Sequence, residues 1–322
     1  MLNRLPILLT SAALIGIAGA LVAAMQVSTD TPLTTRAGQR LARDLAQAKG
    51  GATITLAPGD YGAVAFPKRT FHPAVRLKAE DARFTALILK NVSGIAISGG
   101  TVTGPGGRSY GVTITDANDI VVNDMTITGA HRGIVVAKSD GVTIIDNHLT
   151  GLISDGINIA SSRHIVIRGN SCRNFSPIRS IIDQQGKKVR EGDHADCIQA
   201  WSRPLSPPTS DVIVENNDIE GEMQGVFFGN HVRNGVDDGG FDRITIRNNR
   251  IRISYPNGIV LGNGRDSIVT QNSVSTLPGA VNLRHPESKV RTTIRVDDGA
   301  SNQVCGNIAV DFPGSAFTRS CR

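Results

Sequence analysis

The chain repeats one short phrase, in which alternating β-branched residues lead into an Asn, at intervals close to 23 residues. Two copies read VTIIDNHLTG at 142–151 and ITIRNNRIRI at 244–253. When the copies are aligned, one column contains Met125 followed by Asn147, Asn170, Asn217, Asn249, Asn272 and Asn307. The successive steps are 22, 23, 47, 32, 23 and 35 residues, so 47 is close to two units and the longer single steps contain loops. A repeat of about 20–50 residues indicates a solenoid, a propeller or an array of repeated units.

Each unit also contains a second strand-like phrase, and these phrases align with one another. Three of them are DGINIA at 155–160, DCIQAW at 196–201 and GAVNLR at 279–284. Val, Ile and Thr are frequent in both phrases with a period of two, which is the pattern of a β-strand. Two or three short strands in each unit predict one coil of a parallel β-helix, in which successive coils pair about 4.8 Å apart. The Asn column then predicts either a ladder of stacked side-chain amides or a series of turns.

These repeats resemble those of the right-handed parallel β-helix (pectate-lyase-like) superfamily, which includes exported polysaccharide lyases and uronate C5-epimerases. The resemblance extends over roughly residues 50–312. It implies an all-β fold, a single-stranded right-handed parallel β-helix solenoid, with a capping helix at the N-terminal end. The right hand of the coil is implied by the resemblance and not by the repeats themselves.

Residues 1–24 predict export. They contain a positive charge at Arg4, a long apolar run and small residues before Met25, which is the pattern of a signal peptide. The apolar run is also long enough for an uncleaved membrane anchor, which is the alternative. We expect no membrane span in the mature chain and a periplasmic or extracellular location.

The remaining residues predict a single domain with a cap at each end. Residues 25–51 comprise an N-terminal segment and an amphipathic helix, with Leu41, Leu45 and Ala46 on one face. A helix at this place would cover the exposed strand edges of the first coil. Residues 52–322 then form the parallel β-helix with a C-terminal cap.

The four cysteines predict two disulfides, because an exported chain can keep such bonds. Cys172 and Cys197 occupy inward positions of the repeat, and a bond between Cys305 and Cys321 would tie the tail to the last coil. The alternative is four buried thiols. Cysteine and histidine do not occur at a spacing typical of a metal site, so we predict no resident metal.

The charge balance favours an acidic polysaccharide as the partner. The chain has a formal net charge of +6 and an isoelectric point of about 9.4. Its basic residues are scattered and only 4% of its residues are aromatic, so the sequence offers no surface on which nucleic acid bases could stack. We therefore expect no nucleic acid partner, and we expect a monomer.

Polar side chains that suggest a functional site gather in the middle coils. Because stacked coils place equivalent positions in columns, the second phrases can be compared position by position. The polar members of these columns are Arg132, Asp155, Asn158, Asp196, Gln199 and Trp201. The segment GDHADCIQAW at 192–201 adds Asp193 and His194, and it contains the only Trp of the chain.

Two long loops frame this segment, at 176–192 and 229–242. The second loop contributes His231 and Arg233, and Arg284 comes from a later coil. Loops of this kind are where a rigid scaffold carries residues that hold a substrate.

These residue types suit removal of the C5 proton of a uronate. The reaction needs a group that neutralises the carboxylate, a base that takes the proton and a donor that returns one. His194 is the predicted base, and Asp193 or Asp196 would orient it and raise its basicity. The predicted substrate-binding residues are Arg132, Asp155, Asn158, Gln199, Trp201, His231, Arg233 and Arg284. Asp193 and His194 also resemble part of the Asp-Pro-His motif of β-helix mannuronate epimerases, without its Pro.

Three alternatives stay open at this point. Asp155, Asp193 and Asp196 could act as the acid and base of a glycoside hydrolase, and SDGIN and ADCIQ echo the aspartate motifs of β-helix polygalacturonases. The sequence requires no cofactor, but the same carboxylates could hold Ca²⁺. A non-catalytic glycan-binding β-helix protein would have the same fold.

Overall fold

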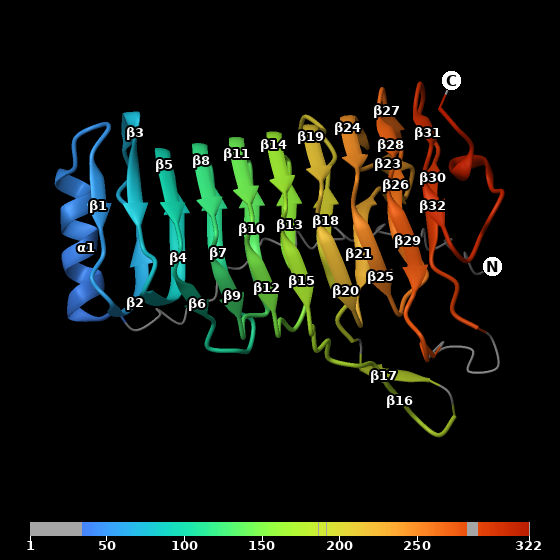
Figure 1. Ribbon diagram of the computed structural model, residues 1–322, viewed down its shortest axis with the longest axis horizontal. Helices are drawn as coiled ribbons and strands as arrows, with labels where there is room; N and C mark the ends of the chain where they lie inside the picture. Colours follow the sequence, from blue (N-terminus) through green and yellow to red (C-terminus); the bar gives the residue numbers. More distant parts are fainter. Residues whose placement is uncertain (1–33, 186, 191, 282–288, 322) are drawn as a thin grey trace, which may run out of the picture. The chain divides into compact units, whose positions relative to one another are not determined.

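The chain is a right-handed parallel β-helix in the computed structural model (Figure 1). The structure describes residues 34–321 except 186, 191 and 282–288. All of these belong to one compact unit, residues 31–322, and the predicted signal peptide lies outside the described residues. In the part that is described, no helix is long and apolar enough to cross a membrane.

The strands stack in three rows, here named rows A, B and C, and neighbours within each row are parallel. Row A contains β2 (Gly59–Ala65), β4 (Ala82–Lys90), β7 (Tyr110–Thr115), β10 (Arg132–Ala137), β13 (Ile157–Ala160), β18 (Asp196–Trp201), β21 (Gln224–Gly229), β26 (Asn257–Gly262) and β30 (Thr293–Asp297). Row B contains β1 (Thr53–Thr55), β3 (Thr70–Lys78), β5 (Ser93–Ser98), β8 (Asn118–Asn123), β11 (Asp140–Ile145), β14 (Arg163–Arg168), β19 (Thr209–Glu215), β24 (Phe241–Arg247), β28 (Ile268–Thr270) and β31 (Gln303–Cys305), with β27 (Gly264–Arg265) beside β24. Row C contains β6 (Thr101–Thr103), β9 (Thr126–Thr128), β12 (His148–Thr150), β15 (Ser171–Arg173), β20 (Asp218–Gly221), β25 (Arg250–Ile253), β29 (Ser273–Thr276) and β32 (Ile308–Ala309).

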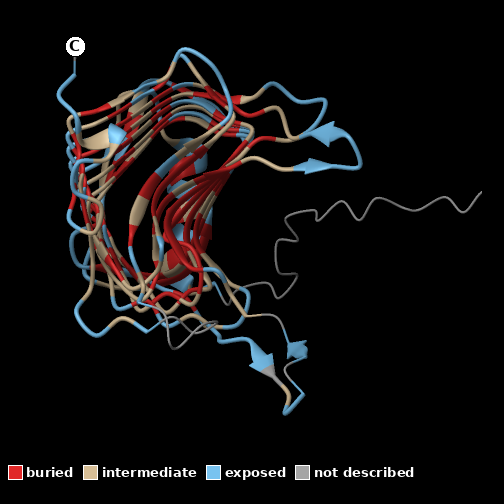
Figure 2. Cartoon of the chain, turned by 90° about the vertical axis from the view of Figure 1, so that its right-hand side faces the viewer, coloured by how far each residue is buried: buried red, intermediate tan, exposed pale blue. Residues whose placement is uncertain are grey.

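The core forms because identical strand patterns stack in register. In row B, Val122 pairs with Ile144, and Ile144 pairs with Ile167, and all three side chains are fully buried. On each strand, the residues directly before and after these positions face outward, since successive side chains of a strand point to opposite sides. Burial of these β-branched side chains contributes about 25 cal/mol per Å² of apolar surface. The period of two in the sequence therefore produces one continuous core along the axis of the coil (Figure 2).

The Asn column is a hydrogen-bonded ladder at the turn between rows B and C. The backbone N–H and side-chain amide of Asn170 both donate to Asn217 Oδ1, at 3.0 and 3.1 Å. The same two bonds join Asn249 to Asn272, and all of these side chains are buried. The preceding residues have positive φ angles, for example 53° at Asp146. The ladder and the turn, which the sequence left as alternatives, are therefore both present.

Each end of the coil is covered. Helix α1 (Arg36–Gln47) begins at Thr35, whose Oγ1 accepts a hydrogen bond from the N–H of Gly38 at 3.0 Å. Leu41 and Leu45 are buried against the first coil as expected, whereas Ala46 is exposed and does not belong to that face. At the other end the 3₁₀ turn η1 (Ala316–Thr318) lies against the last coil, where Phe317 packs on the core.

Both predicted disulfides are present. Cys172 and Cys197 are joined by an S–S bond of 2.05 Å between β15 and β18, and Cys305 and Cys321 by one of 1.98 Å. The alternative of four buried thiols is therefore wrong. The first bond closes the insertion between rows C and A, because its two cysteines lie at either end of that insertion.

The strand predicted at 279–284 is not the one that completes row A. Strand β30 (Thr293–Asp297) pairs with β26 instead, and Asp297 pairs with Gly262. Residues 282–288, including Arg284, lie outside the described residues. The prediction failed because a short apolar phrase at the expected spacing does not decide which segment after a loop pairs with the coil.

Candidate functional site

The middle of row A is flanked by two hairpins. The insertion between β15 and β18 contains β16 (Ile181–Ile182) and β17 (Lys188–Arg190), which pair antiparallel. The loop between β21 and β24 contains β22 (Val232–Arg233) and β23 (Val236–Asp237), which also pair antiparallel. Figure 2 shows one hairpin at the upper right of the coil and the other below its lower edge. We name the outer side of β10, β13, β18 and β21 between these hairpins the site face.

The columns predicted from sequence are correct on the site face. Asn158 pairs with Gln199, which pairs with Phe227 on the next coil. Trp201 pairs with Gly229 in the same way. The parallel register therefore gathers polar side chains that are far apart in the sequence.

Two carboxyl groups lie next to one another beneath this face. Asp155 and Asp196 are 1% and 0% exposed, and the N–H of Gly156 donates to the backbone oxygen of Asp196 at 2.8 Å. Burial raises the pKa of Asp155, although the charge of Arg132 opposes the shift. Burial and then the charge of Asp155 raise the pKa of Asp196 well above its usual range. Both carboxyl groups therefore hold a proton more strongly than an exposed aspartate does, and the shift is larger at Asp196.

Arg132 balances this buried charge. Its Nε lies 2.8 Å from Asp155 Oδ2, although the angle is not that of a hydrogen bond. Its guanidinium also lies over the ring of Tyr110, 5.9 Å from the centroid. The arginine side chain keeps 27% of its surface exposed, so it can pair with a carboxylate outside the protein as well.

The amide side chains of the site face lie beneath its surface. Asn158 is 1% exposed and Gln199 is 7% exposed. Asn158 Nδ2 donates to Asp155 Oδ2 at 3.2 Å, and Gln199 Nε2 donates to Asp196 Oδ2 at 2.6 Å. These amides therefore hold the carboxyl pair. Their predicted contact with substrate stays a prediction.

A histidine that sequence analysis missed pairs with Asp193. Nε2 of His131 lies 3.0 Å from Asp193 Oδ1, and the two side chains are 15% and 21% exposed. Asp193 belongs to the insertion, and its N–H donates to the oxygen of Ile178 at 2.8 Å. His131 directly precedes Arg132 in the sequence, and this position beside the polar column was the available signal.

The other predicted residues that the structure describes are exposed or half-buried. His194 is exposed and directly follows Asp193. Trp201 is half-buried and His231 stacks on it, with ring centroids 5.0 Å apart and planes at 21°. Arg233 is exposed on β22.

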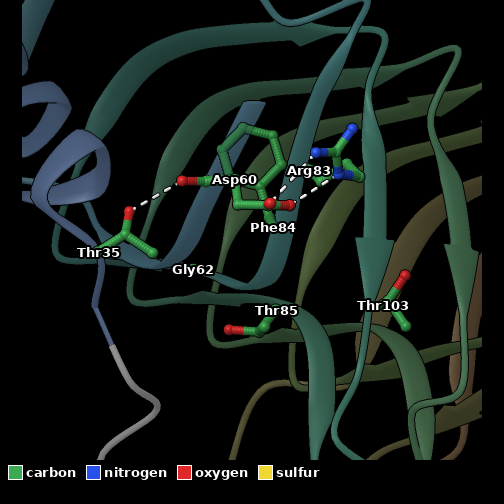
Figure 3. Close-up of a pocket in the computed structure, with 7 residues that line it drawn as sticks. All are labelled: Thr35, Asp60, Gly62, Arg83, Phe84, Thr85 and Thr103. Carbon is green, nitrogen blue, oxygen red and sulfur yellow. Dashed lines mark hydrogen bonds and ion pairs between the residues drawn. The ribbon is translucent and has the colours of Figure 1, made fainter. Parts of the chain in front are cut away.

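A cavity of about 310 Å³ lies elsewhere, at the N-terminal end of row A (Figure 3). Its lining residues are Thr35, Asp60, Gly62, Arg83, Phe84, Thr85 and Thr103. Its charged groups already pair, since Arg83 Nε donates to Asp60 Oδ1 at 2.7 Å. We place the candidate site at the carboxyl pair because acid–base groups from separate coils and an insertion converge there.

Residues 76–191 match the family described as Periplasmic copper-binding protein (NosD). Among the described residues, the donor groups do not fit a copper site. Cys172 lies in the matched segment but is oxidised in a disulfide. Throughout the described residues, no three or more His, Cys, Asp or Glu side chains are grouped so that they could hold a metal ion. We therefore derive no step through a metal.

Solved structures with similar coils include enzymes and an adhesin. A polygalacturonase from Erwinia carotovora is 13% identical with a TM-score of 0.43, and the alignment covers 85% of this chain and 86% of that one. An alginate lyase from Paenibacillus is 16% identical with a TM-score of 0.34, covering 84% and 95%. The Streptococcus pneumoniae surface adhesin PfbA is 10% identical with a TM-score of 0.39, covering 82% and 75%. A search among curated proteins gave no match.

Proposed function

We propose that this protein is an exported enzyme that acts on a uronate-containing polysaccharide by removing the C5 proton, as a lyase or a C5-epimerase does. The observation that carries the proposal is the group of acid–base residues on the site face. His131 and Asp193 form a hydrogen-bonded pair beside Arg132, and His194 directly follows Asp193. Two disulfides support export, since such bonds persist in oxidising compartments.

The proposed chemistry begins at the carboxylate of the sugar. Arg132, whose side chain is partly exposed, pairs with this carboxylate, and Arg233 on the hairpin adds a second positive charge. Removal of negative charge from the carboxylate stabilises the carbanion that forms when C5 loses its proton. The positive charge of Arg132 is thus available both to Asp155 and to the substrate.

Two imidazoles divide the proton transfers. His194 is the base that takes the proton from C5. His131, which lies 3.0 Å from Asp193 Oδ1, gives a proton to the leaving oxygen in a lyase or to the opposite side of C5 in an epimerase. His194 directly follows Asp193, and consecutive α-carbons lie about 3.8 Å apart. The contact between Asp193 and His131 therefore keeps the backbone of His194 near His131.

One observation favours hydrolysis as the second candidate. Asp196 has a strongly raised pKa beside Asp155, and a carboxyl group that keeps its proton is what the general acid of a glycosidase needs. We rank this second because both side chains are buried, at 1% and 0% exposed.

The test is incubation with polygalacturonate, alginate and other uronate polymers. A lyase produces unsaturated uronate ends, seen by ultraviolet absorbance, together with reducing ends. A hydrolase produces reducing ends alone, and an epimerase exchanges the C5 proton with solvent without cleavage. Binding of a polymer with none of these products would establish the glycan-binding alternative and refute the enzyme.

A further inference from the structure

One glutamine connects the buried carboxyl pair to the aromatic surface of the site face. Gln199 Nε2 donates to Asp196 Oδ2 at 2.6 Å. Its Oε1 accepts from Trp201 Nε1 at 2.7 Å and from Asn158 Nδ2 at 2.6 Å. Gln199 is only 7% exposed, so water does not replace these three bonds easily. Every polar atom of its side chain is thereby committed to a neighbour.

Trp201 determines which way this amide points. An indole N–H can only donate, so Gln199 must present its carbonyl oxygen to Trp201. Its NH₂ group then faces Asp196, which must accept. Trp201, Gln199 and Asp196 therefore form a chain of bonds with one direction, and removal of the middle member breaks it on both sides.

Residues of the neighbouring coil also restrict the position of the Trp201 indole. A Cβ atom at position 229 would lie 2.9 Å from Cζ3 of Trp201 and 2.6 Å from Cε1 of Phe227, so a side chain there would displace these two rings. His231 covers one face of the indole in a stacked contact. These contacts present a flat aromatic surface at the edge of the carboxyl pair, of the kind on which the C–H groups of a pyranose ring pack.

We propose that Gln199 is a positioning residue that fixes the indole of Trp201 as the surface on which one pyranose ring of the polysaccharide stacks, beside the carboxyl pair. A sugar that stacks on the covered face takes the place of the imidazole of His231. The identity of the sugar rests on the proposed function, whereas the anchoring of the indole rests on the hydrogen bonds alone.

The anchoring is tested by the emission of Trp201, which is the only Trp of the chain. Gln199→Met removes all three hydrogen bonds and keeps a side chain of similar length. We expect a shifted emission maximum and stronger quenching by acrylamide, with unchanged far-ultraviolet circular dichroism. Gln224→Met is the matched control, because Gln224 is paired with Asp196 in the adjacent strand but accepts its hydrogen bond from Asn257. Wild-type emission and quenching in folded Gln199→Met would overturn the proposal.

The stacking surface is tested by a double-mutant cycle on binding. Oligogalacturonate, oligomannuronate and a neutral cello-oligosaccharide serve as probes in calorimetry. We expect Gln199→Met to weaken binding roughly 3–10-fold, the value of about one hydrogen bond. Since Gln199 acts through the indole, the double variant with Trp201→Phe should bind no more weakly than Trp201→Phe alone. Fully additive losses would overturn the proposal.

The probes separate this inference from the proposed function. Binding of the neutral oligosaccharide alone, with the expected cycle, would support the stacking surface and refute an acidic substrate. Binding of uronate oligomers that neither variant weakens would refute the stacking surface and leave the acidic substrate standing. Binding of none of the probes would refute both the substrate class and the stacking surface.

Discussion

Acidic side chains on row B and on the site face of row A occupy consecutive strands of the same coils, yet their protonation is shifted in opposite directions. On β19 in row B, hydrogen bonds from Arg243 lower the pKa of Asp211 to about 2. On β18 in row A, burial raises the pKa of Asp196 well above the usual range of an aspartate. The difference in pKa comes from solvent access and from the partner of each carboxyl group.

This contrast separates two uses of charge in one fold. The carboxylates of row B pair with arginines. Glu215 is only 5% exposed, and burial alone would raise its pKa, but Arg168 and Arg247, each at 2.6 Å, lower it. Ionisation there favours the folded chain. On the site face, Asp155 and Asp196 lie close together and away from water, so ionisation of both opposes folding. A coil that needed only stability would not require such a pair, which supports a functional role.

The largest expected effect is on activity and concerns the site face alone. His194→Ala should lower turnover on a uronate polymer about 10²–10⁴-fold, the usual contribution of a general base, and leave the melting temperature nearly unchanged. His164→Ala is the matched control, because His164 lies on row B and pairs with Asp140 at 2.6 Å. Full activity of the His194 variant would refute the assigned base. Activity of that variant with loss in Asp155→Asn and Asp196→Asn would favour the hydrolase.

The second effect concerns the disulfide between Cys172 and Cys197, which closes the insertion beside the site face. Row B is held by ion pairs, which are not covalent. Replacing Cys172 and Cys197 together by serine should lower the free energy of unfolding by about 2–4 kcal/mol, because the unfolded chain loses a constraint. Thermal unfolding monitored by circular dichroism measures the loss. The insertion that carries Asp193 should also become more sensitive to protease, and unchanged digestion there would argue against this anchoring.

The third effect is a stability gain from removal of a buried acid. The folded chain holds a proton on Asp196 at pH values where the unfolded chain, with its ordinary pKa of 3.8, has lost it. The stability that this proton contributes is present at low pH and is lost as pH rises above about 4. Asp196→Asn stays neutral and can still accept from Gln199. It should therefore stabilise the protein at neutral pH, by about 1–4 kcal/mol, because the unfolded chain then no longer gains free energy by releasing the proton of Asp196.

The matched substitution on row B should have the opposite sign. Asp211 has a lowered pKa, so its contribution is present above about 3.8 and is lost as pH falls toward about 2. Asp211→Asn should therefore destabilise the protein at neutral pH and flatten its acid unfolding curve. Urea unfolding at several pH values compares the two variants. Loss of stability in both at neutral pH would refute the contrast between the two rows.

The smallest effect is that of a single surface arginine. Arg243→Ala removes the partner of Asp211, but the arginine side chain is 55% exposed, so water screens the pair. We expect a loss of about 0.2–1 kcal/mol, which decreases as salt is added. A loss of stability well above that range, or one insensitive to salt, would mean that this ion pair contributes much more to the stability of row B than a solvent-exposed pair should.

The sequence by itself determined the parts of this protein that repeat. The period of two, the Asn column and the inward cysteines each specify an environment that recurs with every coil. Asn147, Asn170 and Asn217 align by their spacing alone because stacking requires the same residue at the same place. The polar columns of row A followed from the same register, since parallel pairing carries a spacing in sequence directly into a neighbour in space.

Only the tertiary structure decided what the non-repeating parts do. The pair of His131 and Asp193 joins residues 62 positions apart through an insertion whose path no periodicity specifies. In the same way, β30 took the place in row A that the spacing assigned to 279–284, because pairing after a loop depends on where the chain returns. The burial that raises the pKa of Asp155 and Asp196 also depends on several neighbouring coils, which together exclude water from both side chains. Solvent exclusion and the path of a loop depend on many residues together, so an alignment of equivalent repeat positions does not predict them.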